Sequence, residues 1–268
     1  MNENSNSETK DKILLEIYKD AAQPAVRALG SALGTCFEFA SSILLPLKLK
    51  NEKAKLTFQK NLEKYAEELA KIPEEKRCEV HQQIGLPILD KLTYTTEEDI
   101  ADLFIALLTN AANKDMVHTA LPAFVSMISE LSPDEARILN YLKDKEYIEY
   151  CEFRGEKNSW FSYKGHCNFF RATMIENEVE LDKEDNIGMY IANFIRLGIF
   201  VDKEGTTKVD DLIYQKIRDI HSELLNEMNK QKKTYNISSI YVEESFYKIT
   251  ELGKRFIQAC TKSTLKEA

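Results

Sequence analysis

The sequence predicts a mainly α protein that is α+β overall. It consists of an all-helical N-terminal part with long hairpin-like helices and a winged-helix-like C-terminal part with a small β-sheet. Glycine and proline are scarce, at 9 and 6 of 268 residues, which favours helices over a turn-rich sandwich or barrel. Apolar residues recur at helical spacing through the first 130 residues. Segments with the composition of strands occur only after residue 131.

The charge of the chain disfavours one class of function. The sequence is 43% hydrophobic and 30% charged, with a net charge of -8, so it can bury a core while keeping a polar surface. Acidic residues exceed basic ones in both halves, and neither half is a basic module. This balance disfavours non-specific nucleic-acid binding, which depends on neutralising phosphates.

The cysteines and the N-terminus indicate an intracellular protein. Five cysteines are widely spread without a CxxC pair, as is typical of reduced thiols. The opening MNENSNSETKDK is polar, and the first apolar run begins too late for a signal peptide. We therefore expect a cytoplasmic protein, with membrane association on activation as a further hypothesis.

Helical patterns fill a predicted N-terminal domain, residues 9–130, after a disordered tail over residues 1–8. A helix is expected over Thr9–Asp20. Pro24 can open the next helix, because the first turn tolerates a missing donor. That helix carries a long apolar run and should end or kink near Pro46.

More helices are expected before residue 131. The segment Asn51–Ile72 has one apolar stripe among lysines and glutamates, which predicts an amphipathic helix packed on a neighbour. A brief helix over Ile84–Leu92 and another over residues 120–131 are also expected. Between them, Thr95 and Glu98 predict a capping box at the start of a helix. The apolar stripe of the amphipathic helix comprises Ala54, Phe58, Leu62, Tyr65, Leu69 and Ile72.

A strong helix start marks the predicted C-terminal domain, residues 131–268. Ser132 supplies a cap, Pro133 suits the first turn, and Glu135 is the reciprocal acceptor of a capping box. The helix should end near Lys143.

Strand-like segments follow. EYCEF (149–153) and SWFSY (159–163) predict a β-hairpin. The opening of the last helix by Thr-Glu-Leu-Gly at 250–253, in this order of elements, resembles a winged helix; the alternative is a generic α+β tail. The later elements are expected as helix, strand, strand and helix at 187–197, 199–204, 241–250 and 251–260.

Winged helices commonly bind DNA, which gives one hypothesis for function. The recognition helix would be 187–197, with Tyr190, Asn193 and Arg196 as candidate contacts, but only the last two carry side chains suited to reading bases. A helical insert at about 208–233 replaces the basic wing. A protein-binding or structural winged helix is therefore favoured over a DNA-binding one.

The apolar run over residues 28–47 contains one charge, Glu38, and two glycines four apart, Gly30 and Gly34. Its large apolar residues favour membrane insertion by about 2–5 kcal/mol in total, and Glu38 opposes this by roughly 2.5–3.5 kcal/mol. A constitutive membrane span is thus disfavoured. The small-xxx-small glycines permit close helix packing, either in a helical hairpin or at a conditional membrane or self-association surface.

No catalytic motif is found in the sequence. None of the four histidines has a zinc-ligand spacing, and Cys151, His166 and Cys167 lack a fourth ligand at a sensible spacing. There is no phosphate-binding glycine loop and no nucleophile elbow. The sequence predicts no catalytic residues, no cofactor, no metal and no small-molecule substrate.

Several segments resemble a known family. RALGSALG…PLKLKNEKAKLTFQKNLEKYAEELAKIPEE, TYTTEEDIADLFIALLTNAANKD, HTALPAFVSMISELSPDEARIL and KITELGKRFIQAC are together similar to the bacterial abortive-infection alpha family, a domain of unknown function linked to phage defence. The order and spacing of these segments carry the resemblance, which implies a biological role without a mechanism or catalytic residues.

These observations predict a non-enzymatic phage-defence protein that acts through protein–protein contact or self-association and, on activation, through membrane contact. The alternative is a winged-helix DNA-binding transcriptional regulator.

Overall fold

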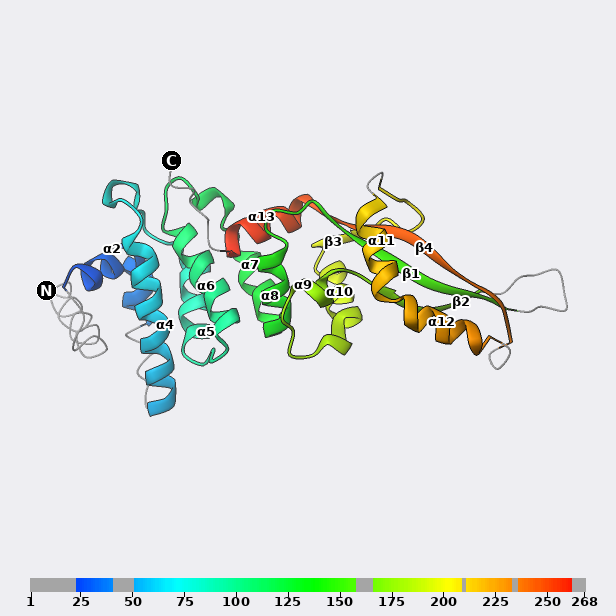
Figure 1. Cartoon of the computed structure of the whole chain (residues 1–268). Coiled ribbons are helices and arrows are strands. Elements are labelled where there is room, and N and C mark those ends of the chain that lie inside the picture. Colours follow the sequence, from blue (N-terminus) through cyan, green and yellow to red (C-terminus); the bar gives the residue numbers. More distant parts are fainter. Residues whose placement is uncertain (1–22, 41–50, 158–165, 209–210, 233–235, 262–268) are drawn as a thin grey trace, which may run out of the picture. The chain divides into compact units, whose positions relative to one another are not determined.

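The computed structural model describes residues 23–40, 51–157, 166–208, 211–232 and 236–261. Its contacts group the chain into two compact units, Met1–Asn140 with Arg255–Ala268 and Tyr141–Lys254 (Figure 1). The described residues are mainly helical, with one four-stranded antiparallel sheet. This confirms the predicted mainly α fold with α+β character. The winged-helix likeness and the predicted domain boundaries stay predictions.

The first unit is built from helices packed around α6 (Glu98–Ala111), most of which is buried. Helix α6 contacts α4, α5 and α7, so it forms the centre of this unit. The other described helices are α2 (Gln23–Phe39), α4 (Glu52–Ala70), α5 (Gln82–Leu92), α7 (Pro122–Ser129) and α8 (Pro133–Tyr141), with short 3-10 turns at Glu74–Lys76 and Val117–Thr119. The predicted tail and the helix over Thr9–Asp20 lie outside the described residues.

Helix starts in this unit show which capping predictions hold. The Glu135 carboxylate accepts hydrogen bonds from the Ser132 backbone N–H and hydroxyl, both at 2.7 Å, which confirms the capping box there. The predicted box at Thr95 and Glu98 is wrong. The Thr95 hydroxyl and backbone N–H instead both donate to the carbonyl of Lys91, in the last turn of α5, at 2.9 and 3.0 Å. Helix α6 therefore starts without a side-chain cap.

The C-terminal helix closes the first unit. Helix α13 (Glu251–Cys260) has the bounds that the sequence predicts. Its Phe256 ring packs edge-on against Phe124 of α7 with centroids 5.2 Å apart. The Asn110 side chain of α6 donates to the Ala259 carbonyl at 2.9 Å. Helix α13 is thus part of the hydrophobic core of the first unit.

The second unit contains the sheet. Its strands are β1 (Tyr147–Lys157), β2 (His166–Ala172), β3 (Phe200–Asp202) and β4 (Ile237–Ile249), in the order β2-β1-β4-β3. Strands β1 and β4 pair along almost their whole length. The expected strand over 159–163 lies outside the described residues.

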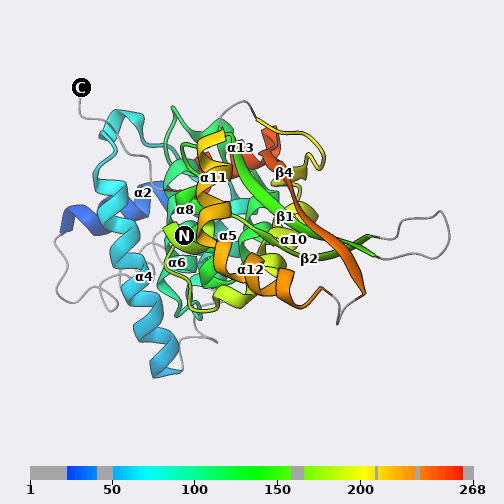
Figure 2. The same cartoon turned by 45° about the vertical axis from the view of Figure 1, so that its right-hand side comes forward.

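Helices cover both faces of this sheet. Helix α11 (Asp211–Ile220) packs Tyr214 and Ile217 on Cys151 and Phe153 of β1, and α11 and α12 (Ser222–Lys230) run beside the sheet in both views (Figures 1 and 2). The predicted helical insert is thus two helices with a break at His221. On the other face, the Phe194 ring of α10 packs edge-on against Phe200 of β3. The remaining helices are α9 (Ile175–Glu178) and α10 (Ile187–Arg196).

Candidate functional site

The two faces of β1 differ in chemistry because successive side chains of a strand point to opposite sides. Cys151 and Phe153 point to the α11 face and join a hydrophobic core. Tyr150, Glu152 and Arg154 point to the other face. That face therefore carries the polar side chains that could form a site.

A charged cluster spans all four strands on this face. Arg171 of β2 binds the carboxylates of Glu152 at 3.1 Å and Asp202 at 2.5 Å. Arg154 of β1 binds Glu152 as well and reaches Glu243 of β4. Both arginines also bind Glu204, which follows β3. We call these two arginines and four carboxylates the charged cluster.

Two tyrosines complete the cluster. The Tyr150 hydroxyl donates to Asp202 at 2.8 Å, and the Tyr247 hydroxyl accepts from Arg171 at 3.2 Å. Their rings stack with centroids 4.4 Å apart, and the Arg171 guanidinium lies 4.8 Å from the Tyr150 centroid. This geometry combines cation–π and hydrogen-bonding contacts in one group.

The cluster shifts the pKa values of its members. Burial and the hydrogen bond to Asp202 raise the pKa of Tyr150. Burial lowers the pKa of Arg171, but hydrogen bonds to Tyr247, Asp202 and Glu152 outweigh it, and the pKa is raised. Tyr150 is thus held as a neutral hydroxyl and Arg171 as a cation. Neither state makes a base or a nucleophile.

The geometry of the cluster suits a structural role. Glu152 is only 2% exposed, and its charge is compensated by both arginines. A buried carboxylate needs such partners, since removing one leaves an uncompensated charge. Because its members come from every strand, the cluster ties the sheet together.

A groove lies beside the cluster, between the sheet and α10. It has a volume of about 440 Å³. Arg171 and Tyr247 form one wall, and Ile187, Gly188 and Ile191 of α10 lie opposite. The combination of an apolar wall with a few polar groups is typical of binding sites. The further lining residues are Phe170, Thr173, Glu176, Asp185, Ala192 and Ile195.

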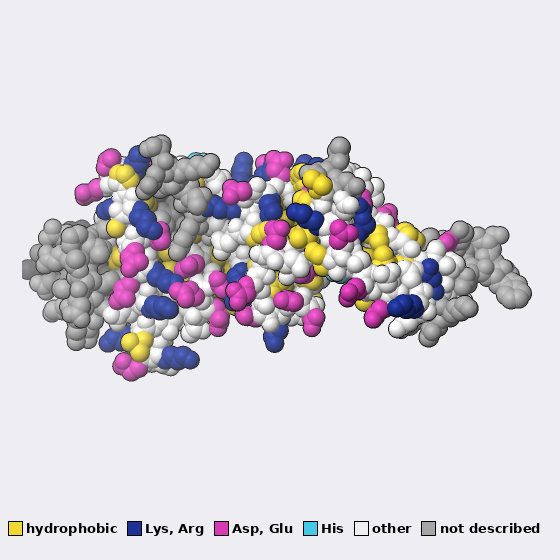
Figure 3. Space-filling model, in the orientation of Figure 1, with side chains coloured by type: hydrophobic (Ala, Val, Ile, Leu, Met, Phe, Trp, Pro, Cys, Tyr) yellow, Lys and Arg dark blue, Asp and Glu magenta, His cyan; other side chains and the backbone are white. Residues whose placement is uncertain are grey.

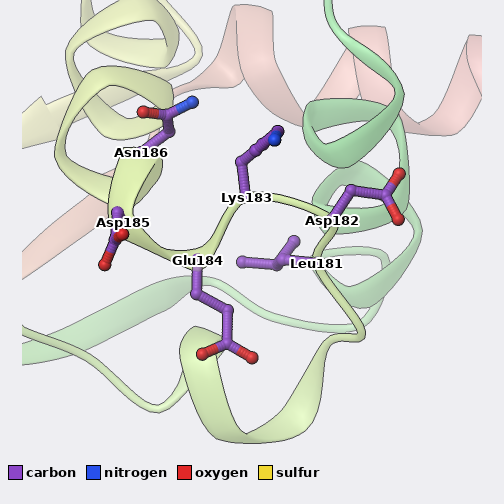
Figure 4. Close-up of a pocket in the computed structure, with 6 residues that line it drawn as sticks. All are labelled: Leu181, Asp182, Lys183, Glu184, Asp185 and Asn186. Atoms are coloured by element: carbon purple, nitrogen blue, oxygen red, sulfur yellow. The ribbon is translucent and has the colours of Figure 1, made fainter.

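A second hollow adjoins this groove through Asp185. It measures about 480 Å³ and is lined by the consecutive residues 181–186 (Figure 4). Figure 4 shows that the Asp182 carboxylate points away from those of Glu184 and Asp185. These side chains do not converge on one point, so the hollow alone lacks the arrangement of a catalytic site.

The predicted apolar segment is described as far as Ala40; the rest of it, with the expected end near Pro46, lies outside the described residues. Helix α2 is not continuous, because Gly34 has non-helical backbone angles of φ 37° and ψ -119°. This corrects the expectation of one uninterrupted helix. Gly30 is partly buried and Glu38 is exposed. In the described part of the chain, no helix has the length and apolar character needed to cross a membrane.

The kink in α2 is held by Glu79. Its Oε1 accepts from the Thr35 backbone N–H at 2.8 Å and from the Thr35 hydroxyl at 2.9 Å. A Cβ on Gly34 would lie 2.2 Å from the same oxygen. The positive φ therefore favours glycine at this position, and a side chain there would also force the Glu79 carboxylate to move. The proposed membrane or self-association role of Gly30, Gly34 and Glu38 stays a prediction.

The candidate recognition-helix residues of α10 differ in burial. Tyr190 is 7% exposed. The Asn193 amide oxygen accepts from Arg196 Nη2 at 2.7 Å, and Arg196 itself is exposed. The three residues thus do not form one exposed set, and DNA binding stays a prediction.

The thiols of Cys151 and Cys167, weighed above as zinc ligands, contact backbone carbonyls in the structure. The Cys151 thiol is buried beside the Tyr214 carbonyl, at 3.7 Å, and the Cys167 thiol donates to the Gly155 carbonyl at 3.4 Å. No group of three potential metal-ligating side chains occurs among the residues the structure describes.

Sequence reasoning missed the charged cluster and the groove. The alternation of Tyr150 and Glu152 within the predicted strand over 149–153 was a usable signal, since a charged residue on a half-buried strand needs a partner; Arg154 lay just beyond that predicted strand. Their partners Asp202 and Glu243 lie in strands about 50 and 90 positions away, and only the pairing of the strands brings them together.

Comparisons with known proteins place the chain in a family but reveal no mechanism. No protein of curated function matches it. One solved structure, an uncharacterized protein from the hydrocarbon-degrading marine bacterium Alcanivorax borkumensis SK2, has 15% identity and a TM-score of 0.34 over 55% of this chain and 94% of that one. That similarity is too weak to transfer a fold or a function.

The sequence model of the family described as abortive infection alpha matches residues 57–260. The match runs from α4 to the end of α13 and includes the charged cluster and the groove, whereas the apolar segment over 28–47 precedes it. Because it spans about three quarters of the 268 residues, the chain belongs to the abortive infection alpha family.

Proposed function

We propose that this protein acts in phage defence by binding a protein partner and not by catalysing a reaction. The family supports the defence role. The charged cluster supports the non-catalytic part of the proposal, because its arginines and its buried carboxylate are bound to one another within the sheet. Groups committed in this way hold a fold in place and are poorly suited to exchanging protons with a substrate.

Exposed apolar side chains support a partner surface. Met189 on α10 is 70% exposed, and Leu212 on α11 is 66% exposed. Figure 3 shows apolar side chains mixed with charged ones over α11 and α12. Because α10 and α11 cover opposite faces of the sheet, Met189 and Leu212 belong to two separate candidate surfaces, and exposed apolar side chains among polar ones occur at protein–protein interfaces.

The defence role is tested by plating a panel of phages on bacteria that express the protein or carry an empty vector. We expect fewer plaques for at least one phage and death of infected cells before phage release. Unchanged plaque numbers across the panel would refute the defence role.

Membrane contact on activation is a second candidate. Phe39, near the end of the described part of the apolar segment, is 50% exposed, so this segment presents an aromatic ring to its surroundings. Leakage of dye from liposomes and membrane fractionation after phage challenge test this mode. A protein that stays out of the membrane fraction while protecting cells would exclude it.

A further inference from the structure

One face of α10 forms an open apolar groove. Gly188, Ile191, Ala192 and Ile195 recur at helical spacing and all line the hollow beside the sheet. Ile195 is 38% exposed. A Cβ on Gly188 would meet nothing within 4 Å. The small residues leave room for an inserted side chain, and the isoleucines supply apolar contact.

The entrance to this groove is acidic. Asp185 lines both the groove and the adjoining hollow, and Glu184 and Asp185 are exposed. Figure 4 shows both carboxylates on the side of the loop opposite Lys183. The segment 176–185 contains six carboxylates against one lysine. The electrostatic potential here favours a cationic group.

The positive charge of the groove wall does not offset this acidity. Arg171 is bound to Glu152, Asp202 and Glu204, so its donors are directed into the charged cluster. A phosphate or carboxylate ligand would have to displace these carboxylates. The groove therefore selects against anions, nucleic acids included.

We propose that the α10 groove binds a segment of a partner protein that inserts an apolar side chain against α10 and places a lysine or arginine beside Glu184 and Asp185. This inference rests on the proposed function, because it names the chemistry of the partner. The proposed ligand is cationic, whereas the DNA of the winged-helix hypothesis is anionic.

A direct test uses two fluorescein-labelled peptides, one alternating leucine with lysine and one alternating leucine with glutamate. Fluorescence anisotropy with the full-length protein should show binding of the lysine peptide only. Ala192→Trp fills the groove without changing the charge and should weaken binding about ten-fold, as burial of an anchor side chain is lost. Leu56→Trp on α4, where the side chain is 65% exposed, is the matched control and should bind like wild type.

Charge variants separate a specific site from general attraction to an acidic protein. Glu184→Gln with Asp185→Asn removes two charges at the groove, and Glu223→Gln with Glu227→Gln removes two from α12. Only the first pair should weaken binding. Equal weakening by both pairs, or unchanged binding by a folded Ala192→Trp protein, would overturn the proposal. Thermal unfolding establishes that each variant is folded.

Phage plating distinguishes failure of this proposal from failure of the proposed function. If wild type protects cells and Ala192→Trp protects them equally, the groove is not the partner site but the defence role stands. If wild type gives no protection, the defence role itself fails, whatever the peptides bind.

Discussion

The kink in α2 and the charged cluster of the sheet both depend on a carboxylate, an exposed one at Glu79 and a buried one at Glu152, but they differ in the number of partners. At the kink, one carboxylate, Glu79, supplies both hydrogen bonds to Thr35. In the sheet, Glu152 has two arginine partners, and each arginine has further carboxylates. At the kink, substitution of one residue removes both of these hydrogen bonds. In the sheet, substitution of one arginine weakens several ion pairs at once.

We expect the largest loss of stability from a substitution in the charged cluster of the sheet. Arg171→Ala leaves Glu152 and Asp202 with less compensation, and we expect the free energy of unfolding to fall by about 3 kcal/mol, the lower end for a broken buried pair, because the side chain is 29% exposed. Chemical denaturation and hydrogen exchange of β1 amides measure this.

The control for that change is Lys254→Ala. Its partners Glu146 and Glu251 are largely exposed, and such ion pairs contribute about 0–1 kcal/mol. If both variants lose the same stability, the cluster does not hold the sheet together.

The next effect is a pH dependence in the α2 region. Burial and the nearby Glu79 charge raise the pKa of Cys36 from 9.0 to about 11. The folded state therefore favours the neutral thiol. This contribution is complete below pH 9 and is lost as the pH rises toward 11, amounting to at most about 2–3 kcal/mol.

Denaturation midpoints across this pH range should fall more steeply for wild type than for Cys36→Ala. Other groups titrate there too, so the difference between the two proteins isolates the thiol. Parallel pH curves would show that Cys36 does not contribute.

A smaller effect is expected at the kink itself. Gly34→Ala forces a side chain into a positive φ and against Glu79 Oε1, and we expect a loss of about 1–3 kcal/mol. Gly205→Ala is the matched control, since Gly205 has φ 73° with nothing within 4 Å of its would-be Cβ. Thermal unfolding compares them, and the excess loss at Gly34 measures the close approach. Equal losses would mean that Glu79 moves away without cost.

The smallest expected effect is loss of the carboxylate that holds the kink. Glu79→Ala removes the acceptor for Thr35, as in the loss of a helix cap, and should cost about 1 kcal/mol. Glu79→Gln keeps an acceptor and should cost less. Glu67→Ala on the exposed side of α4 serves as the control. A Glu79→Ala protein as stable as the control would show that the kink is maintained by backbone packing alone.

Local sequence signals predicted the fold well where the stabilising contacts are local. Ser132 and Glu135 are three residues apart, and their capping box forms as expected. The closing helix also has the expected bounds. The predicted capping box at Thr95 was wrong because the Thr95 hydroxyl donates to a carbonyl of the preceding helix. The local sequence pattern does not determine which of the two helices the hydroxyl contacts.

The candidate site could not be predicted because its parts are distant in sequence. The kink needs Gly34 and Glu79, which lie 45 positions apart, and the glycine spacing alone suggested helix packing. The charged cluster needs the register of four strands. The groove needs α10 placed against the sheet. Tertiary contacts, not local propensity, create all three.

The central claim is that the polar centre of the sheet holds the fold while defence depends on binding. It is tested most directly by phage plaque counts on cells that express Tyr150→Phe at the wild-type level. This change removes the hydroxyl bound to Asp202 and leaves the stacked ring. We predict plaque counts as low as with wild type. A folded Tyr150→Phe protein that no longer protects cells would contradict the account and indicate chemistry at this site.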